Sequence, residues 1–193
     1  MIKIFSVLYD RVMRWSEHPH APMYLGGLSF AESSFFPIPP DVMLAPMSLA
    51  DPRKAWYFAA ITTLASVLGG IFGYLIGLFA FDFVEPLLLE SGYHAKYLLA
   101  VEWFDVWGFW AIFIAGFSPI PYKVFTITAG VISMAFLPFV LASLVGRGAR
   151  FFLVAGLMSW GGSRMEQSLR RYIDAVGWLT VILALAVVAI AKL

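Results

Sequence analysis

Five ionisable side chains interrupt otherwise apolar stretches of this chain, and they are the residues best suited to chemistry. A charged side chain inside a bilayer costs several kcal/mol unless it is paired or hydrated, so such residues usually mark a binding site or a transport path. We expect all five to line one polar cavity: Glu32, Asp41, Lys123, Arg147 and Arg150.

The basic members of this set suit the binding of an anion. Arg147 and Arg150 are three residues apart, so on a helix their side chains share a face. Guanidinium groups form planar forks that match phosphate oxygens, and Lys123 adds a third positive charge. These three residues are therefore candidate substrate-binding residues.

The acidic members suit proton transfer. Desolvation favours the protonated form of a carboxyl group, so Glu32 and Asp41 are candidates for coupling transport to protons. A plainer alternative is that the acidic and basic side chains neutralise one another and hold the chain together. Pairing and binding are compatible, so this alternative weakens the site hypothesis without replacing it.

Common enzyme signatures are missing from the sequence. It has no G-x-x-x-x-G-K phosphate loop, no H-E-x-x-H, no G-x-S-x-G and no cysteine. Its three histidines, His18, His20 and His94, fall outside the long apolar runs and are too sparse for a metal site. We therefore expect neither a catalytic residue nor a metal or cofactor.

The composition predicts that lipid surrounds most of the chain. Of its 193 residues 61% are hydrophobic and 13% are charged, and the mean hydropathy is +0.84. A membrane-spanning helix needs about 20 mostly apolar residues, and uncharged runs cover residues 55–81, 124–146 and 175–191. The net charge of +1 gives no electrostatic reason to expect a nucleic-acid partner.

The elements that position the charged side chains follow from the order of apolar and polar segments. Two apolar segments, 22–50 and 106–135, are interrupted by prolines, which a single unbroken spanning helix would not tolerate. Each of them precedes a long apolar helix, expected at about 51–81 and at about 137–160.

Three further segments lie around this framework. Residues 1–17 place charged and apolar side chains on different sides of a helix, which is typical of a helix at the membrane interface. Residues 82–105 are rich in acidic and aromatic side chains and predict a loop with a second interfacial helix. Residues 172–192 predict a simple C-terminal transmembrane helix.

An internal repeat relates the two broken segments. The pattern G-x(8)-F-x-P-I-P occurs twice, displaced by 82 positions (119 − 37). We therefore expect a single all-α membrane domain over residues 1–193, with repeat 1 at about 1–81 and repeat 2 at about 82–163. A hairpin turn is expected at each tripeptide, formed by Pro37, Pro39, Pro119 and Pro121.

The distribution of basic residues predicts the topology. Lys and Arg flank the first broken segment on both sides, and short loops rich in these residues stay in the cytoplasm. Both ends of that segment and the amino terminus are therefore expected inside, while the second broken segment begins and ends outside. The two hairpins would then be re-entrant and would point at each other from opposite leaflets, an inverted repeat of the transporter type. Because Asp41 and Lys123 are equivalent in the repeat, the hairpin tips would bring these opposite charges together.

A stripe of glycines marks the first long helix. Gly69, Gly73 and Gly77 are spaced by four residues, so they lie along one face. Such a face lets another backbone approach closely, and we interpret it as a packing surface.

Three stretches resemble the DedA family, in particular its short YqaA-like branch: A-E-S-S-F-F-P-I-P-P-D (31–41), G-F-S-P-I-P-Y-K (116–123) and G-R-G-A-R-F (146–151). The resemblance implies a bacterial inner-membrane protein related to the eukaryotic lipid scramblases with the VTT domain. It also implies movement of polyprenyl-phosphate carriers or phospholipids between leaflets. Glu32 and Asp41 would take the family's acidic positions, and Arg147 and Arg150 would match arginines of the branch.

One departure from the family pattern bears on the substrate. Many members have R-F-x-P-x-x-R in the second hairpin, whereas here Gly116 replaces the first arginine, Tyr122 stands at the second and Lys123 follows. The loss of one positive charge predicts a weaker grip on an anion or a different head group. Tyr122 thereby joins the candidate substrate-binding residues, and undecaprenyl phosphate is the leading candidate substrate.

The sequence therefore favours a membrane lipid transporter or flippase, with membrane lipids and protons as its partners and a homodimer left open. A membrane lipid-pyrophosphate phosphatase is an alternative, although we expect no serine or histidine beside the charged side chains to act as nucleophile or base. A proton or ion pathway, or a purely structural membrane component, is the third interpretation.

Overall fold

A computed structural model describes five stretches of the chain: residues 18, 20–36, 38–90, 94–118 and 121–161. The described residues form an all-α structure without β-strands, as the sequence predicts. The expected helices at 1–17 and 172–192 lie outside these stretches, as do Pro37 and Pro119.

Two long apolar helices form the frame of the molecule. Helix α4 spans Ala55–Glu90 and follows a short 3-10 helix, η1, at Pro52–Lys54. The second long helix spans Phe136–Gly161, close to the predicted bounds. Pro52–Phe81 and Phe136–Gly161 are each long and apolar enough to cross a membrane.

The two long helices pack against each other in antiparallel directions. Gly148 lies opposite Thr63, and Gly156 lies opposite Trp56. The contact is close at Gly156, where an added Cβ would lie 3.2 Å from the ring of Trp56.

The predicted loop does not begin at residue 82, and the predicted second interfacial helix is continuous with the segment after residue 105; its position at a membrane interface stays a prediction. Helix α4 continues to Glu90, and helix α5 runs without a break over His94–Phe117. The expected end of repeat 1 near residue 81 therefore falls inside α4. Acidic and aromatic side chains change where a helix meets water, but they leave its backbone hydrogen bonds intact, so a change in polarity was a poor sign of a helix end.

Two helical hairpins, each broken at a proline-rich turn, lie against this frame. The first hairpin consists of α2 (Ala21–Ser34) and α3 (Asp41–Ala50), and the second consists of α5 and α6 (Tyr122–Val131). Pro40 and Pro121 stand at the N-caps of α3 and α6, with φ angles of −67° and −60°. Proline disfavours helical geometry at the preceding residue and suits a helix start, so each turn ends one helix and begins the next.

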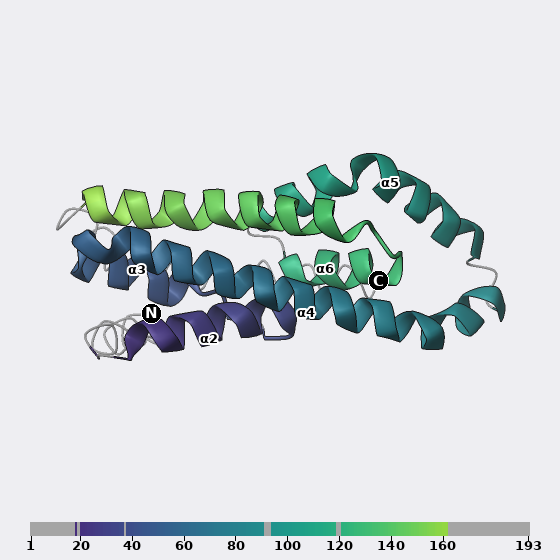
Figure 1. Ribbon diagram of the computed structural model, residues 1–193, viewed down its shortest axis with the longest axis horizontal. Coiled ribbons are helices and arrows are strands. Elements are labelled where there is room, and N and C mark those ends of the chain that lie inside the picture. Colours follow the sequence, from purple (N-terminus) through teal and green to yellow (C-terminus); the bar gives the residue numbers. More distant parts are fainter. Residues whose placement is uncertain (1–17, 19, 37, 91–93, 119–120, 162–193) are drawn as a thin grey trace, which may run out of the picture.

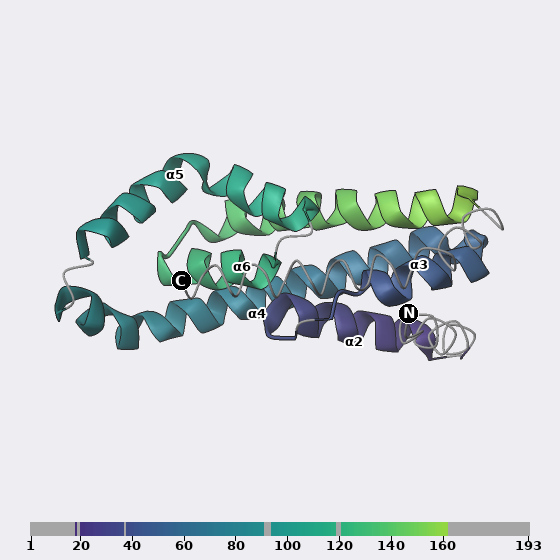
Figure 2. The same cartoon turned by 180° about the vertical axis from the view of Figure 1, so that it is seen from behind.

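The hairpins approach from opposite ends of the long helices. In Figure 1, α2 runs toward the middle of the molecule and α3 returns to the same end, whereas α5 and α6 do the same from the other end. Figure 2 shows the same arrangement from behind, with both turns near the middle of α4. The side chains at the two turns are therefore close to one another.

The glycine stripe of α4 is a packing surface, as predicted. A Cβ added at Gly69 would overlap the backbone of Phe30 in α2, and one added at Gly77 would overlap the backbone of Ile127 in α6. Gly73 lies between them, where an added Cβ would lie 2.5 Å from the hydroxyl of Thr126. The stripe thus allows one helix of each hairpin to approach α4 at backbone distance.

The apolar core is divided into two clusters, one beneath each hairpin. The first joins α2 and α3 to the start of α4 and to the Phe136–Gly161 helix, and it includes Leu25, Leu44 and Phe151. The second joins α5 and α6 to the later part of α4 and includes Ile112 and Tyr122. The polar side chains described below lie between these two clusters.

Replacement of Gly77 by alanine should weaken the packing of α6 on α4. The added methyl group overlaps the Ile127 carbonyl, and overpacking of this kind costs about 1–3 kcal/mol. Thermal unfolding of the purified protein in detergent, followed by tryptophan fluorescence, should show a lower midpoint for Gly77→Ala.

The matched control is Gly27→Ala, because an added Cβ at Gly27 meets nothing within 4 Å. Equal midpoints for the two variants would contradict the packing role of the stripe.

Candidate functional site

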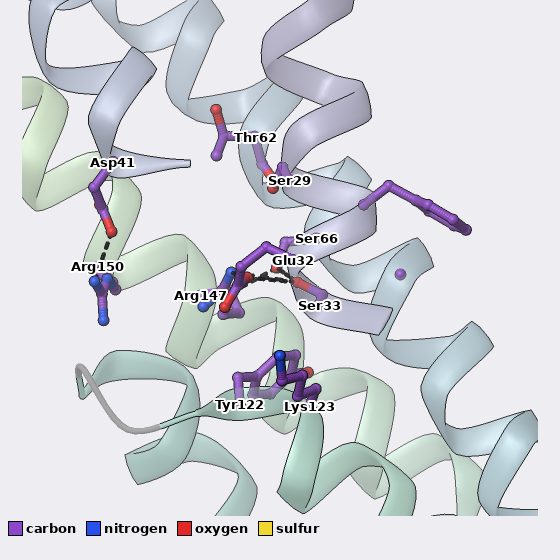
Figure 3. A network of polar contacts seen from close by, with 12 residues as sticks. Ser29, Glu32, Ser33, Asp41, Thr62, Ser66, Tyr122, Lys123, Arg147 and Arg150 are labelled. Carbon is purple, nitrogen blue, oxygen red and sulfur yellow. Dashed lines mark hydrogen bonds and ion pairs between the residues drawn. The ribbon is translucent and has the colours of Figure 1, made fainter. Parts of the chain in front are cut away.

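The five charged side chains singled out above converge where the two hairpin turns meet the Phe136–Gly161 helix (Figure 3). We call Glu32, Asp41, Lys123, Arg147 and Arg150 the charged cluster. Arg147 and Arg150 point toward the hairpins from one face of that helix, as their spacing predicts.

Arg147 is the most buried member of the charged cluster. Its guanidinium group forms an ion pair with Glu32, and the two side chains are 3% and 14% exposed. Its Nε donates a hydrogen bond to Ser66 Oγ at 2.5 Å, and its Nη2 contacts Ser33 Oγ at 3.3 Å. The two serine hydroxyls also bond to each other at 2.7 Å. One side chain thus joins the long helix to α2 and α4.

Two aromatic rings enclose the same guanidinium group. Its Cζ lies 4.9 Å from the centre of the Tyr122 ring and 4.6 Å from the centre of the Phe151 ring. These rings belong to the second and first apolar clusters, respectively. Tyr122 is itself held in place, because its hydroxyl bonds to Ser143 Oγ at 2.5 Å. Cation–π contacts of this kind are worth up to about 2 kcal/mol when the cation is desolvated.

Arg150 connects the two hairpin turns. Its Nη2 pairs with Asp41 Oδ2 at 2.6 Å, at the start of α3, and its Nη1 donates to the Ser118 carbonyl at 2.6 Å, directly after α5. Both charged side chains are partly open, at 19% exposed for Arg150 and 22% for Asp41. Among the described residues, the buried Oδ1 of Asp41 has no hydrogen-bond partner.

The predicted pairing of Asp41 with Lys123 gives way to a different arrangement. The Lys123 ammonium donates to the Phe36 carbonyl at 3.3 Å, so the two hairpin turns do meet, while Asp41 pairs with Arg150. The break before Asp41 frees backbone carbonyl groups for Lys123, and the long planar fork of Arg150 reaches the carboxylate and a carbonyl together. Equivalent positions in a repeat therefore did not become partners.

Small polar residues form a part of the site that sequence analysis missed. Ser29 donates to the Thr62 carbonyl at 2.7 Å and Ser34 to the Gly69 carbonyl at 3.0 Å, so α2 is hydrogen-bonded along α4 on both sides of Ser33. Two serines do lie beside the charged side chains, because Ser33 and Ser66 contact Arg147, whereas the expectation that no serine there acts as a nucleophile stays a prediction. Small residues four apart on both helices were the available signal.

Gly116, where the family pattern has an arginine, borders the charged cluster. An added Cβ at this position would lie 3.3 Å from the backbone nitrogen of Arg147. An arginine side chain at position 116 would therefore start next to Arg147 and its ion pair with Glu32. Within the described ranges, no group of three histidine, aspartate or glutamate side chains is arranged to hold a metal ion.

These features define an all-α membrane protein in which two opposed helical hairpins enclose a cluster of paired charges. Residues 38–160 match the VTT domain, and the chain therefore belongs to the VTT-domain family, the DedA family.

Two relatives match over nearly the whole chain. An uncharacterized protein of Haemophilus influenzae is 52% identical over 191 residues, which cover 99% of this chain and all of the relative. An uncharacterized protein of Histophilus somni is 48% identical over the same shares of both chains. No solved structure matches.

The Glu32–Arg147 ion pair should stabilise the fold only when both of its members are present. Removal of one partner leaves an unpaired buried charge, which costs about 3–5 kcal/mol. Arg147→Met and Glu32→Gln should each lower stability in detergent unfolding experiments, and the double variant should recover most of the loss. Additive losses would contradict the proposed coupling.

Proposed function

We propose that this protein is a lipid transporter that moves an anionic lipid between the leaflets of a membrane. The observation that carries the proposal is the charged cluster between two helix breaks in an otherwise apolar protein. Broken helices that meet near the middle of a membrane are a recurring transporter plan, because freed backbone groups and charges can line a path for a polar head group.

The proposal includes a re-entrant inverted repeat. Each hairpin would enter and leave through one face of the membrane, the first from the cytoplasm and the second from outside. Similar sequence offsets in the two halves support the repeat. In the first half, hydrogen-bonded pairs between α2 and α4 lie 33 residues apart at Ser29–Thr62 and Ser33–Ser66 and 35 apart at Ser34–Gly69. In the second half, Ser118 and Arg150 lie 32 apart.

The basic side chains would bind the head group. Arg150 is partly exposed, and among the described residues Lys123 donates only to the Phe36 carbonyl, so both would contact phosphate oxygens first. Arg147 would join them only if its pair with Glu32 opened, since it is nearly fully buried. Tyr122 would set the position of Arg147 through their ring contact.

The acidic side chains would couple transport to protons. Protonation of Asp41 would neutralise the partner of Arg150 and free a guanidinium group for a phosphate. Protonation of Glu32 would free Arg147 in the same way, deeper in the protein. The driving force would then be a proton gradient across the bacterial cytoplasmic membrane, with the amino terminus in the cytoplasm.

The chemical class of the lipid follows from the cluster's charges. Three basic side chains near the turns suit a phosphate monoester or diester on a long apolar chain. A polyprenyl phosphate such as undecaprenyl phosphate is the leading candidate, and an anionic phospholipid is the second.

Serines beside the charged cluster raise the phosphatase alternative again, but their geometry argues against it. Ser33 and Ser66 are fully buried, and their hydroxyls bond to each other and to Arg147. A nucleophilic serine needs an adjacent base and access to the substrate. We therefore propose a transporter and not an enzyme. Phosphate release from a polyprenyl pyrophosphate by the purified protein would reverse this choice.

Removal of the Arg150 charge should impair lipid movement. Arg150→Gln loses a charge-assisted hydrogen bond worth about 1.5–3 kcal/mol, which corresponds to a loss of roughly 10- to 100-fold. Proteoliposomes loaded with labelled undecaprenyl phosphate or phosphatidylglycerol would measure the rate at which label reaches the outer leaflet. Lys54→Gln is the matched control, because Lys54 is a highly exposed cation outside the cluster. Unchanged transport by Arg150→Gln would disprove the binding site.

Loss of the Asp41 carboxylate should uncouple transport from the proton gradient. Asp41→Asn keeps the side-chain shape but cannot take up a proton, so an imposed pH gradient should no longer accelerate lipid movement. Exchange of lipid without a gradient should persist. Asp51→Asn is the control, because Asp51 pairs with Lys54 at one end of the molecule.

The same proteoliposomes separate transport from a simple proton pathway. Proton flux measured with a pH-sensitive dye should require the transported lipid. Equal flux in vesicles without that lipid would favour a proton channel. A full response of Asp41→Asn to the gradient would remove Asp41 from the coupling scheme.

A further inference from the structure

A surface groove lies between α2 and α4, and none of its lining residues belongs to the charged cluster. It has a volume of about 510 Å³ and opens to the outside of the molecule. This volume is in the range of small-molecule sites, roughly 300–1,000 Å³. The α2–α4 groove is lined by His20, Pro22, Met23, Gly26, Gly27, Tyr57 and Ile61.

The groove exists because α2 lacks side chains at two adjacent positions. Among the described residues, a Cβ added at Gly27 meets nothing within 4 Å, and one added at Gly26 would lie 3.3 Å from Cγ2 of Ile61. The glycine stripe of α4, in contrast, is filled by neighbouring backbones. The pair at 26 and 27 therefore leaves open space with an apolar floor.

The mouth of the groove is polar, and an exposed basic residue, Arg53, lies near it in sequence without lining it. His20 and Tyr57 line it, and Arg53 precedes Tyr57 by four residues at the start of the same helical segment. The neighbouring Lys54 is occupied by Asp51 at 3.0 Å, a contact that also lowers the pKa of the Asp51 carboxyl group. Within the part of the chain that the structure describes, no carboxylate pairs with Arg53.

Aromatic side chains place this mouth at the level of lipid head groups. Trp56 stacks on Phe152 with ring centres 5.8 Å apart and meets Trp160 edge-on at 6.4 Å. Tryptophan and tyrosine concentrate where a membrane meets water, so Trp56, Trp160 and Tyr57 mark that level. Ile61 lies one helical turn further along α4, about 6 Å deeper at 1.5 Å per residue, among the acyl chains.

We propose that the α2–α4 groove binds one phospholipid with an anionic head group. One acyl chain lies over Gly26, Gly27 and Ile61, and the head group contacts Arg53, His20 and Tyr57. The apolar floor, the exposed guanidinium group of Arg53 and the interfacial level of the mouth each match one part of such a lipid. Binding here requires no transport through the charged cluster, so either proposal can fail while the other stands.

Photo-crosslinking of the full-length protein in lipid nanodiscs tests the site. The probe is phosphatidylglycerol with a diazirine on one acyl chain, and mass spectrometry locates the adducts. We expect adducts concentrated on residues 20–27 and 57–61, and their loss in Gly27→Trp, where the indole fills the groove. Leu64→Trp is the matched control, because Leu64 is 60% exposed on α4 and does not line the groove.

The head group is tested by competition. Unlabelled phosphatidylglycerol should displace the probe better than phosphatidylcholine, and Arg53→Gln should reduce that preference about fivefold, which corresponds to about 1 kcal/mol per basic residue near an anionic lipid surface. If Gly27→Trp does not fold, Gly27→Leu replaces it, and the adduct map of the unmodified protein stands by itself.

Three results would overturn the proposal. Adducts spread evenly over all lipid-exposed helices would indicate ordinary boundary lipid. Adducts unchanged in Gly27→Trp would exclude the groove, and no preference for phosphatidylglycerol would exclude the anionic head group. Cross-links between residues 1–17 and the groove in place of lipid adducts would show that the chain itself occupies it.

Discussion

The burial of the Arg147 charge is the constraint on which the rest of the structure depends. A guanidinium group that is only 3% exposed must recover the cost of its lost hydration from neighbours within the protein. Glu32 supplies the opposite charge, two serine hydroxyls supply acceptors, and two rings supply their electron-rich faces. These partners come from α2, α4, α6 and the Phe136–Gly161 helix. No arrangement that separates those elements can satisfy the guanidinium group.

Close packing of backbones is what makes these contacts geometrically attainable. Serine side chains are short, so Ser33 and Ser66 can bond to each other and to Arg147 only if α2 approaches α4 closely. Gly69 permits that approach because its Cα sits against the backbone of Phe30. Gly77 and Gly130 have the same function between α4 and α6. The glycines therefore set the helix separation, and the polar contacts depend on it.

The two ion pairs differ in burial, and the difference suggests different tasks. The Glu32–Arg147 pair is enclosed by rings and serines, so opening it would disrupt several helix contacts at once. The Asp41–Arg150 pair is roughly one-fifth exposed at the hairpin turns, and a carboxylate oxygen there lacks a partner among the described residues. A pair of the second kind can exchange partners with a head group at a lower cost in desolvation. The inner pair is thus built into the helix contacts, while the outer pair is partly exposed at the hairpin turns.

The sequence by itself determined the class of the protein, the helix breaks at the two proline tripeptides and the set of ionised side chains. Each follows from a local rule: apolar composition, the backbone limits of proline and the cost of charge in lipid. Helix ends that no proline marks were harder to predict. The acidic stretch after Phe81 was predicted to be a loop because its polarity changes, but helix α4 continues through it to Glu90.

Only the tertiary structure decided which charge pairs with which. Asp41 and Lys123 match in the repeat, yet Asp41 pairs with Arg150, and the four-residue spacing of small polar residues did not by itself show that Ser33 and Ser66 would contact Arg147. Partner choice depends on separations of a few ångströms between helices distant in sequence. The glycine stripe predicts that other helices approach α4 closely, but which helices approach and at which residues depends on the tertiary packing.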